Sequence, residues 1–263
     1  MKGAIIGDII GSRFERGHPT TGQPIKTTDF DLFTVDCRFT DDTVLTIAVA
    51  DAILNQKDFA EAIMEYANAY PQAGYGGTFR KWMAGEIMGP YNSWGNGGAM
   101  RVSPVGWLYN DLESVRRVAR ETAAVTHNHP EGMKGAEAVA TAIFLAREGG
   151  GKEDIRQFLQ SEFGYRLQRT VEDIRPDYTF DVSAAGSVPE AIIAFLDSSN
   201  FIDSIRLAVS LGGDTDTQAA IAGSIAEAFY GGVPPAVEEV MGAFLPNAFV
   251  DVLGAFERVL QVG

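Results

Sequence analysis

Apolar residues recur at the spacing of an α-helix along almost the whole chain, and this pattern limits the fold more than any other feature. Residues three and four apart lie on one face of a helix, so each apolar stripe predicts a helix that buries one side. The stripes span residues 43–54, 58–70, 114–126, 132–147, 214–230 and 247–262. Pro189 is expected to begin another helix and Asp203 to cap the next. No hairpin signal of the Asn-Gly type separates two alternating apolar runs. The pattern predicts an all-α fold, with strand confined to minor pieces.

Glycine recurs at positions 3, 7 and 11, within the apolar run GAIIGDIIG. A helix here would carry a glycine stripe that lets its backbone approach a neighbouring helix or a ligand closely. A buried strand followed by a glycine turn is the alternative. Farther along, residues 167–186 are polar and interrupted by Pro176, which predicts a long loop. Helical patterns continue on both sides of it, so residues 1–263 are predicted to form a single domain.

Composition places the chain among ordinary globular proteins, with 46% hydrophobic and 21% charged residues. No apolar run reaches the roughly 18 residues of a membrane helix, so no membrane partner is expected. The N-terminal run contains Asp8 and no small-residue cleavage site, which makes it a poor signal peptide. Cys37 is the single cysteine and excludes an internal disulfide framework. These features predict a cytoplasmic protein.

The formal net charge of −14 argues against general nucleic-acid binding. Proteins of that class neutralise phosphate with clustered Lys and Arg, and the chain has no such basic stripe. An anionic ligand would need local compensation from bound cations, a helix N-terminus or a nest of backbone N–H groups.

Two short acidic clusters stand at the heads of predicted helices, far apart in the sequence. The first is Thr40-Asp41-Asp42-Thr43, and the second is Asp214-Thr215-Asp216-Thr217, which follows Gly212-Gly213. Asp41 or Asp42 alone is most simply explained as a helix cap. Two carboxylates as close as Asp214 and Asp216 repel one another unless a cation relieves them. Crowded carboxylates with neighbouring hydroxyls are oxygen ligands for a hard divalent cation, so convergence of the two clusters would create a metal centre.

Three other segments carry candidate chemistry. The stretch Ser93–Arg101 is rich enough in glycine to offer backbone N–H groups to a phosphate, although a tight loop before a helix explains it equally well. The run His127-Asn128-His129-Pro130 suggests zinc, but only three histidines exist and no cysteine pair accompanies them. Glu15 alone would usually be a solvated charge.

Taken together, these segments resemble the ADP-ribosylglycohydrolase family over nearly the whole chain. The matching motifs are GDIIGSRFE at residues 7–15, RFTDDT at 38–43, WGNGGAMR at 94–101, THNHPEG at 126–132 and LGGDTDTQAA at 211–220. The paired TDD and GGDTDT motifs, each followed by a helix, are the most specific part. The resemblance implies a compact orthogonal multi-helix bundle with a binuclear metal centre in a central cleft.

The resemblance also assigns roles to residues. It implies two Mg²⁺ or Mn²⁺ ions, held by Thr40, Asp41, Asp42, Asp214, Asp216 and Thr217. It implies substrate contacts from Ser93, Gly95, Asn96, Gly97, Gly98 and His129. Glu15, Asp41, Asp42 and Asp216 are the implied catalytic residues, with the base left open among these carboxylates. An aromatic near Tyr178 and Phe180 is a further candidate to stack on adenine.

The implied activity is metal-dependent hydrolysis of the glycosidic bond that links ADP-ribose to an acceptor. ADP-ribosylated protein arginine is the leading substrate, and serine, nucleic acid or a small molecule are the alternatives. Two rivals come from other classes: an ADP-ribose-binding member without turnover, and a metal-dependent phosphoesterase, because two ions also cleave phosphate esters. A monomer is expected.

Overall fold

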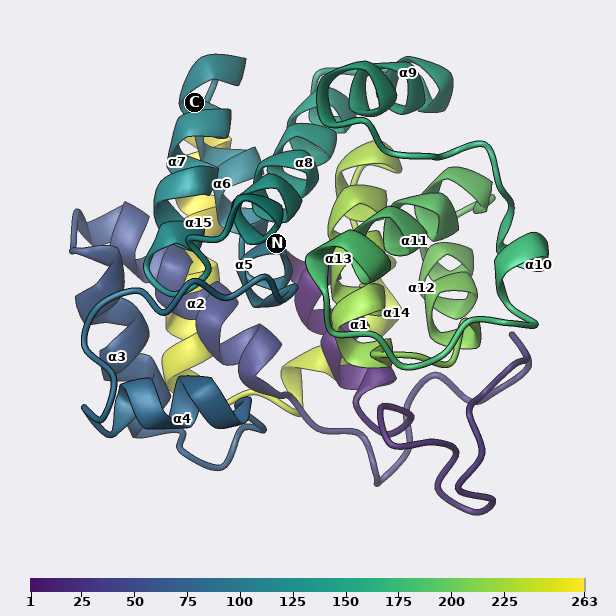
Figure 1. Cartoon of the computed structure of the whole chain (residues 1–263), viewed down its shortest axis with the longest axis horizontal. Coiled ribbons are helices and arrows are strands. Elements are labelled where there is room, and N and C mark those ends of the chain that lie inside the picture. The colour runs from purple at the N-terminus through teal and green to yellow at the C-terminus, as the bar shows by residue number, and fades with distance from the viewer. Residues whose placement is uncertain (263) are drawn as a thin grey trace.

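The computed structural model describes residues 1–262, and within that range the only β-structure is an isolated bridge between Gly95 and Ser183 (Figure 1). The helices are α1 (Lys2–Gly11), α2 (Asp41–Asn55), α3 (Phe59–Ala69), α4 (Gly77–Met83), α5 (Gly97–Met100), α6 (Ser103–Leu108), α7 (Leu112–Ala124), α8 (Pro130–Arg147), α9 (Lys152–Phe163), α10 (Val171–Ile174), α11 (Ala184–Asp197), α12 (Phe201–Ser210), α13 (Thr215–Phe229), α14 (Pro235–Gly242) and α15 (Asn247–Val262). The all-α prediction is therefore confirmed.

Helices α1 and α13 lie side by side at the centre of the molecule, with α11 and α12 on one side and α2 and α3 on the other (Figure 1). The glycine stripe explains their closeness. A Cβ added at Gly3 or Gly7 would lie 2.1 Å from a backbone oxygen of α13, and one added at Gly11 would lie 2.4 Å from such an oxygen. The strand alternative for this segment is wrong, and the stripe is a contact between two helix backbones.

Short polar side chains cap several of the helices, as their sequence positions suggest. Asp58 caps α3 by accepting hydrogen bonds from the N–H groups of the first turn. Two predicted caps are wrong by a few residues. Thr40, not Asp41 or Asp42, caps α2. Asn200, not Asp203, caps α12, because the Asn200 side chain accepts from Asp203 N.

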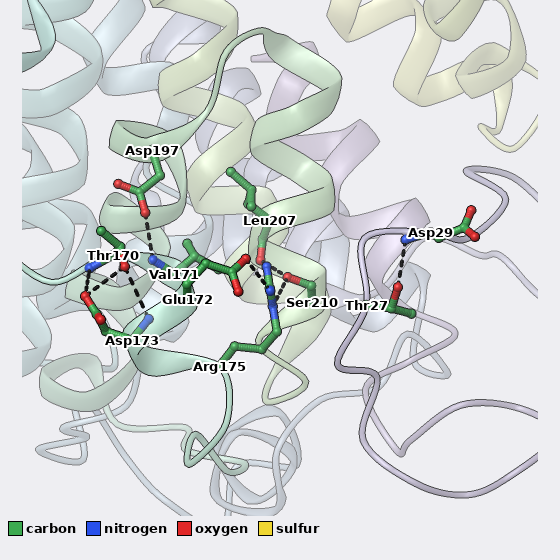
Figure 2. Close-up of polar contacts among 10 residues, drawn as sticks. All are labelled: Thr27, Asp29, Thr170, Val171, Glu172, Asp173, Arg175, Asp197, Leu207 and Ser210. Carbon is green, nitrogen blue, oxygen red and sulfur yellow. Dashed lines mark hydrogen bonds and ion pairs between the residues drawn. The ribbon is translucent and has the colours of Figure 1, made fainter.

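Residues 167–186 hold more helix than the predicted long loop. Thr170 and Asp173 form a capping box that starts the short helix α10, and Val171 N donates to Asp197 Oδ2 at 2.7 Å (Figure 2). Arg175 Nε then donates to Ser210 Oγ of α12 at 3.0 Å. Helix α11 begins at Ala184, before the expected start at Pro189, because Pro189 is tolerated early in a helix.

The interior is filled by apolar side chains from both halves of the chain, including residues of α1, α2, α8, α11 and α13. Cys37 is buried and free. Among the described residues, no helix is both long enough and apolar enough to cross a bilayer.

Candidate metal centre

The two acidic clusters meet at the N-terminal ends of α2 and α13. Carboxylate oxygens of Asp8, Asp42 and Asp216 lie within 4.8 Å of one another, and the same holds for Glu15, Asp214 and Asp216. Asp216 belongs to both groups, so its carboxylate is shared by two sets of candidate metal ligands. The expected convergence of the clusters is therefore observed.

Asp8 fixes the position of the first cluster. It is fully buried on α1 and accepts hydrogen bonds from the backbone N–H and the hydroxyl of both Thr40 and Thr43. The Thr40 contacts measure 2.8 Å from N and 2.7 Å from Oγ1. Since these N–H groups lie at the start of α2, the Asp8 carboxylate ties that helix end to α1. Asp8 was not among the residues expected at the site.

The second cluster is held by contacts of its own. Asn96 Nδ2 donates to Asp214 Oδ2 at 2.7 Å and to Ser187 Oγ at 3.1 Å, which ties the cluster to α11. Thr217 N donates to Asp216 Oδ1 at 2.9 Å, and Thr215 Oγ1 donates to Gly11 O at 2.8 Å. The end of α1 therefore contacts the start of α13 through a hydrogen bond as well as through glycine.

Burial and mutual repulsion disfavour the charged forms of these carboxylates. Burial raises the pKa of Asp214 to about 6, and burial followed by repulsion from Asp8 raises the pKa of Asp41 to about 8. Burial, followed by repulsion from the neighbouring aspartates, raises the pKa of both Asp42 and Asp216 well above its usual value. A divalent cation would reverse this situation, because it favours the charged form of every nearby carboxylate.

The centre opens into a cavity of about 440 Å³. That volume suits a small-molecule ligand. One side carries the carboxylates of Glu15, Asp41, Asp42, Asp214 and Asp216, and Arg101 also lines the space. Trp94 and Phe180 line the cavity with half of each side chain exposed (53% in both). The cavity thus combines an acidic end with aromatic side chains that solvent can reach.

Most of the residues expected to contact substrate line this cavity, namely Ser93, Gly95, Asn96 and Gly97. Gly98 is not among the described lining residues, because it is buried against Ala123 of α7. His129 is also absent from the lining, since its side chain caps α8 by accepting from Glu131 N at 3.1 Å. Tyr178 packs against Gly213, away from the lining.

The expected metal residues are all near the centre. Asp41, Asp42, Asp214, Asp216 and Thr217 line the cavity. Thr40 is buried behind them, bound to Asp8. In residues 1–262, two groups of side chains lie close enough together to share an ion, and both consist of carboxylates alone. Zinc binding by the histidine run therefore has no support.

The lining residues that the sequence did not predict include His127, Arg101 and Trp94. His127 lies two positions before His129, and only the start of α8 decides which of the two faces the cavity. Arg101 ends the glycine-rich motif and is completely buried, a rare state for an arginine. Trp94 opens that motif, and a large exposed aromatic beside glycine is a usable signal for a binding site.

Comparison with known proteins agrees with this geometry. The chain is 29% identical to the ADP-ribosylhydrolase ARH3 of Gallus gallus, over 93% of this chain and 88% of the relative, and 29% identical to that of Homo sapiens, over 88% and 84%. It is 28% identical to the ADP-ribosylarginine hydrolase Tri1 of Pseudomonas putida, over 89% and 71%. A solved structure described as an ADP-ribosylglycohydrolase-related protein complex shares the fold, with a TM-score of 0.71 and 24% identity over 98% of this chain and 95% of that chain. The model of the ADP-ribosylglycohydrolase family matches residues 1–256, and the chain therefore belongs to this family of enzymes.

Proposed function

We propose that this enzyme uses two divalent cations, Mg²⁺ or Mn²⁺, to hydrolyse the glycosidic bond between ADP-ribose and a protein arginine. The observation that carries the proposal is the pair of carboxylate groups that share Asp216. Such a shared carboxylate is suited to two ions held close together, an arrangement common in hydrolases.

The residues fit such ions. Both groups offer only oxygen, which suits Mg²⁺ and Mn²⁺ and disfavours zinc. Asp42 Oδ1 is buried without any hydrogen-bond partner in the described chain, as expected of an atom reserved for a cation. Thr40, Asp41, Asp42, Asp214, Asp216 and Thr217 are the proposed ligands. Bound ions would polarise a water molecule and hold the ribose hydroxyls.

Glu15 is the proposed base that takes the proton of the attacking water. It is half-buried beside Asp214 and Asp216, at the edge of the cavity, where water can reach it. Glu15 belongs to the second carboxylate group as well, but it is the only member of the two groups that is not fully buried, so it is the best placed to exchange a proton with water. Cleavage at the anomeric carbon passes through an oxocarbenium-like state, which the surrounding carboxylates would stabilise electrostatically.

The rest of ADP-ribose is proposed to follow the glycine-rich segment. The N–H groups of Gly95 and Asn96 already donate to Ser93 Oγ and Val182 O, so they are not free to bind a diphosphate. That contact falls to the Ser93 hydroxyl, the Gly97 N–H and the ring of His127. Trp94 and Phe180 are the proposed stacking partners for adenine, since a purine gains about 1–3 kcal/mol from each such contact.

Arginine is the favoured acceptor because one relative is named for ADP-ribosylarginine hydrolysis.

The test is incubation with an ADP-ribosyl-arginine protein, with and without EDTA, followed by addition of Mg²⁺ or Mn²⁺. Free ADP-ribose should appear, stop with EDTA and return with either metal. AMP with ribose phosphate would indicate the phosphoesterase, and binding of ADP-ribose without any product would indicate the non-catalytic member. A panel of ADP-ribosylated arginine, serine and DNA then identifies the acceptor. Faster release from serine or DNA than from arginine would refute the acceptor assignment.

A further inference from the structure

A buried polar chain leads from Arg101 to the cavity. Arg101 Nη2 donates to Thr126 Oγ1 at 2.9 Å and to Thr122 O at 2.9 Å. Thr126 Oγ1 lies 2.8 Å from Nδ1 of the adjacent His127. All three side chains are buried, and Arg101 has no exposed surface at all. The proposed reaction above leaves Arg101 and Thr126 without a role.

Arg101 occupies this place at an energetic disadvantage. Its Nε and Nη1 have no hydrogen-bond partner within residues 1–262. No carboxylate forms an ion pair with it in that range either, although Asp41 is near enough to influence its pKa, which burial lowers to about 10. A buried guanidinium without these contacts is costly, and an apolar residue would pack here more favourably. A residue that destabilises the fold in this way is expected at a functional position.

The hydrogen-bonding capacity of Thr126 decides how the chain is oriented. A hydroxyl has one hydrogen and two lone pairs, and a guanidinium can only donate, so Arg101 occupies one lone pair. Thr126 is completely buried, and within residues 1–262 the only other hydrogen-bond partner of its hydroxyl is His127 Nδ1. A buried hydroxyl hydrogen is expected to find an acceptor, so the hydrogen of Thr126 goes to His127 Nδ1, which has to accept it.

The ring of His127 is also held in place, with Nε2 toward the cavity wall. A Cβ added at Gly97 would lie 2.8 Å from both Nε2 and Cε1, so the ring lies directly against that glycine. The ring of Tyr91 lies 6.2 Å away on a tilted plane. Burial, followed by the charge of Arg101, lowers the pKa of His127 to about 3, so the imidazole is neutral at physiological pH. A neutral imidazole carries one hydrogen, on one nitrogen only.

We propose that Arg101 and Thr126 are positioning residues that hold His127 with its hydrogen on Nε2, as a fixed donor to an oxygen of bound ADP-ribose. Arg101 donates to the Thr126 oxygen, and the Thr126 hydroxyl in turn donates to His127 Nδ1. Nδ1 must therefore carry a lone pair, which excludes the tautomer with hydrogen on Nδ1. This inference rests on the proposed function for the identity of the ligand, whereas the tautomer itself is a property of the free protein.

The tautomer is tested by ¹⁵N NMR of the imidazoles in the free protein, where only three histidines contribute. The signal of His127 should show hydrogen on Nε2 alone at neutral pH. T126V removes the hydroxyl at nearly constant shape and should populate the Nδ1–H form, whereas T126S should restore the wild-type signal. T122V is the matched control, because Thr122 is equally buried, near the end of α7, and its hydroxyl donates only to Ala119 O.

ADP-ribose binding, measured by calorimetry with Mg²⁺ present, gives the second readout. T126V should weaken it about tenfold, since a hydrogen bond to a charged group is lost in part of the molecules. T126S and T122V should bind as the wild type does, and R101M should repeat the effect of T126V. Hydrogen on Nδ1 in the wild type, or a T126V variant with unchanged tautomer and affinity, would overturn the proposal. A correct tautomer in a protein that does not bind ADP-ribose would instead count against the proposed function.

Discussion

Asp216→Asn distinguishes two effects of the acidic centre: the stability that carboxylate repulsion removes from the metal-free fold, and the stabilisation that bound metal provides. The substitution keeps the shape of the side chain and removes one charge from both carboxylate groups. Without metal the variant should be more stable than the wild type, because repulsion is relieved. With metal it should lose most of the stabilisation that the wild type gains.

The magnitude follows from the geometry. Two ionised carboxylates within 4.8 Å repel by about 3–4 kcal/mol at an effective dielectric constant of roughly 20. Proton uptake limits this cost, because burial and neighbouring charges raise the pKa of Asp216 itself. We therefore expect Asp216→Asn to add about 2 kcal/mol to the free energy of unfolding at pH 8, or about 4–6 °C in Tm for a chain of this size. Saturating Mg²⁺, at a hundred times its Kd, should stabilise the wild type by about 2.7 kcal/mol.

The sign of the pH dependence follows from the raised pKa values. Asp8 and Asp214 have pKa values of about 6 in the folded protein, and Asp41 has one of about 8. An unfolded aspartate has a pKa near 4, so these groups destabilise the metal-free fold little below about pH 4 and progressively more as the pH rises to about 8. The advantage of Asp216→Asn should therefore be small at pH 5 and large at pH 8.

The assay is thermal unfolding of both proteins at pH 5 and pH 8, with EDTA or with Mg²⁺. Asp51→Asn is the matched control, because Asp51 is also buried on α2 but pairs with Lys57 at 2.8 Å and lies outside both carboxylate groups. It should lower Tm at pH 8 and leave the effect of Mg²⁺ unchanged. The reasoning fails if Asp216→Asn destabilises the metal-free protein at pH 8, or if Mg²⁺ stabilises it as much as the wild type.

Three further substitutions test separate parts of the structure. Gly7→Ala should destabilise the fold by about 3 kcal/mol or more in a denaturant titration, because its Cβ would lie 2.1 Å from Ala219 O; an unchanged midpoint would contradict the observed packing. Asp8→Asn should weaken Mn²⁺ binding in calorimetry by about 10- to 100-fold, because an amide cannot accept every hydrogen bond that Thr40 and Thr43 donate to the carboxylate. Trp94→Ala should weaken ADP-ribose binding about tenfold and leave Tm within about 1 °C, since the side chain is 53% exposed; equal affinity would exclude stacking on this residue.

The helices were predictable because they depend on short-range patterns, whereas the convergence of the two acidic clusters was expected only from the family resemblance. Apolar spacing and capping residues are local, and the carboxylates of each cluster follow one another in the sequence. Asp8 was not predictable in the same way. Its partners begin 32 residues later, and nothing near Asp8 indicates which donors it will meet. Asp8 stands in the GDIIGSRFE motif, but the motif does not say which donors its carboxylate will meet.

His127 and His129 show how a small local choice changes a functional assignment. Both stand in one motif, and His129 was assigned to the cleft from the family resemblance. Pro130 can occupy the first position of a helix, which leaves His129 as the cap of α8 and directs its Nδ1 to Glu131 N. His127 then precedes the helix start and faces the cavity. The first residue of α8 decides which of the two histidines faces the cavity, and helix boundaries are hard to place to within two residues.

The glycine stripe and Asp8 both lie on α1, so one short motif positions both acidic clusters of the metal centre. Contact of Gly3, Gly7 and Gly11 with α13 fixes the register of the second acidic cluster relative to α1. Asp8, on the same helix, fixes the start of α2 and hence the first cluster. Helix α1 is therefore the common reference for both clusters, and a shift of α1 by even an ångström would change every distance in the centre. A chain that kept all six proposed ligands but lost the stripe would be expected to bind metal poorly, because its carboxylates would no longer meet.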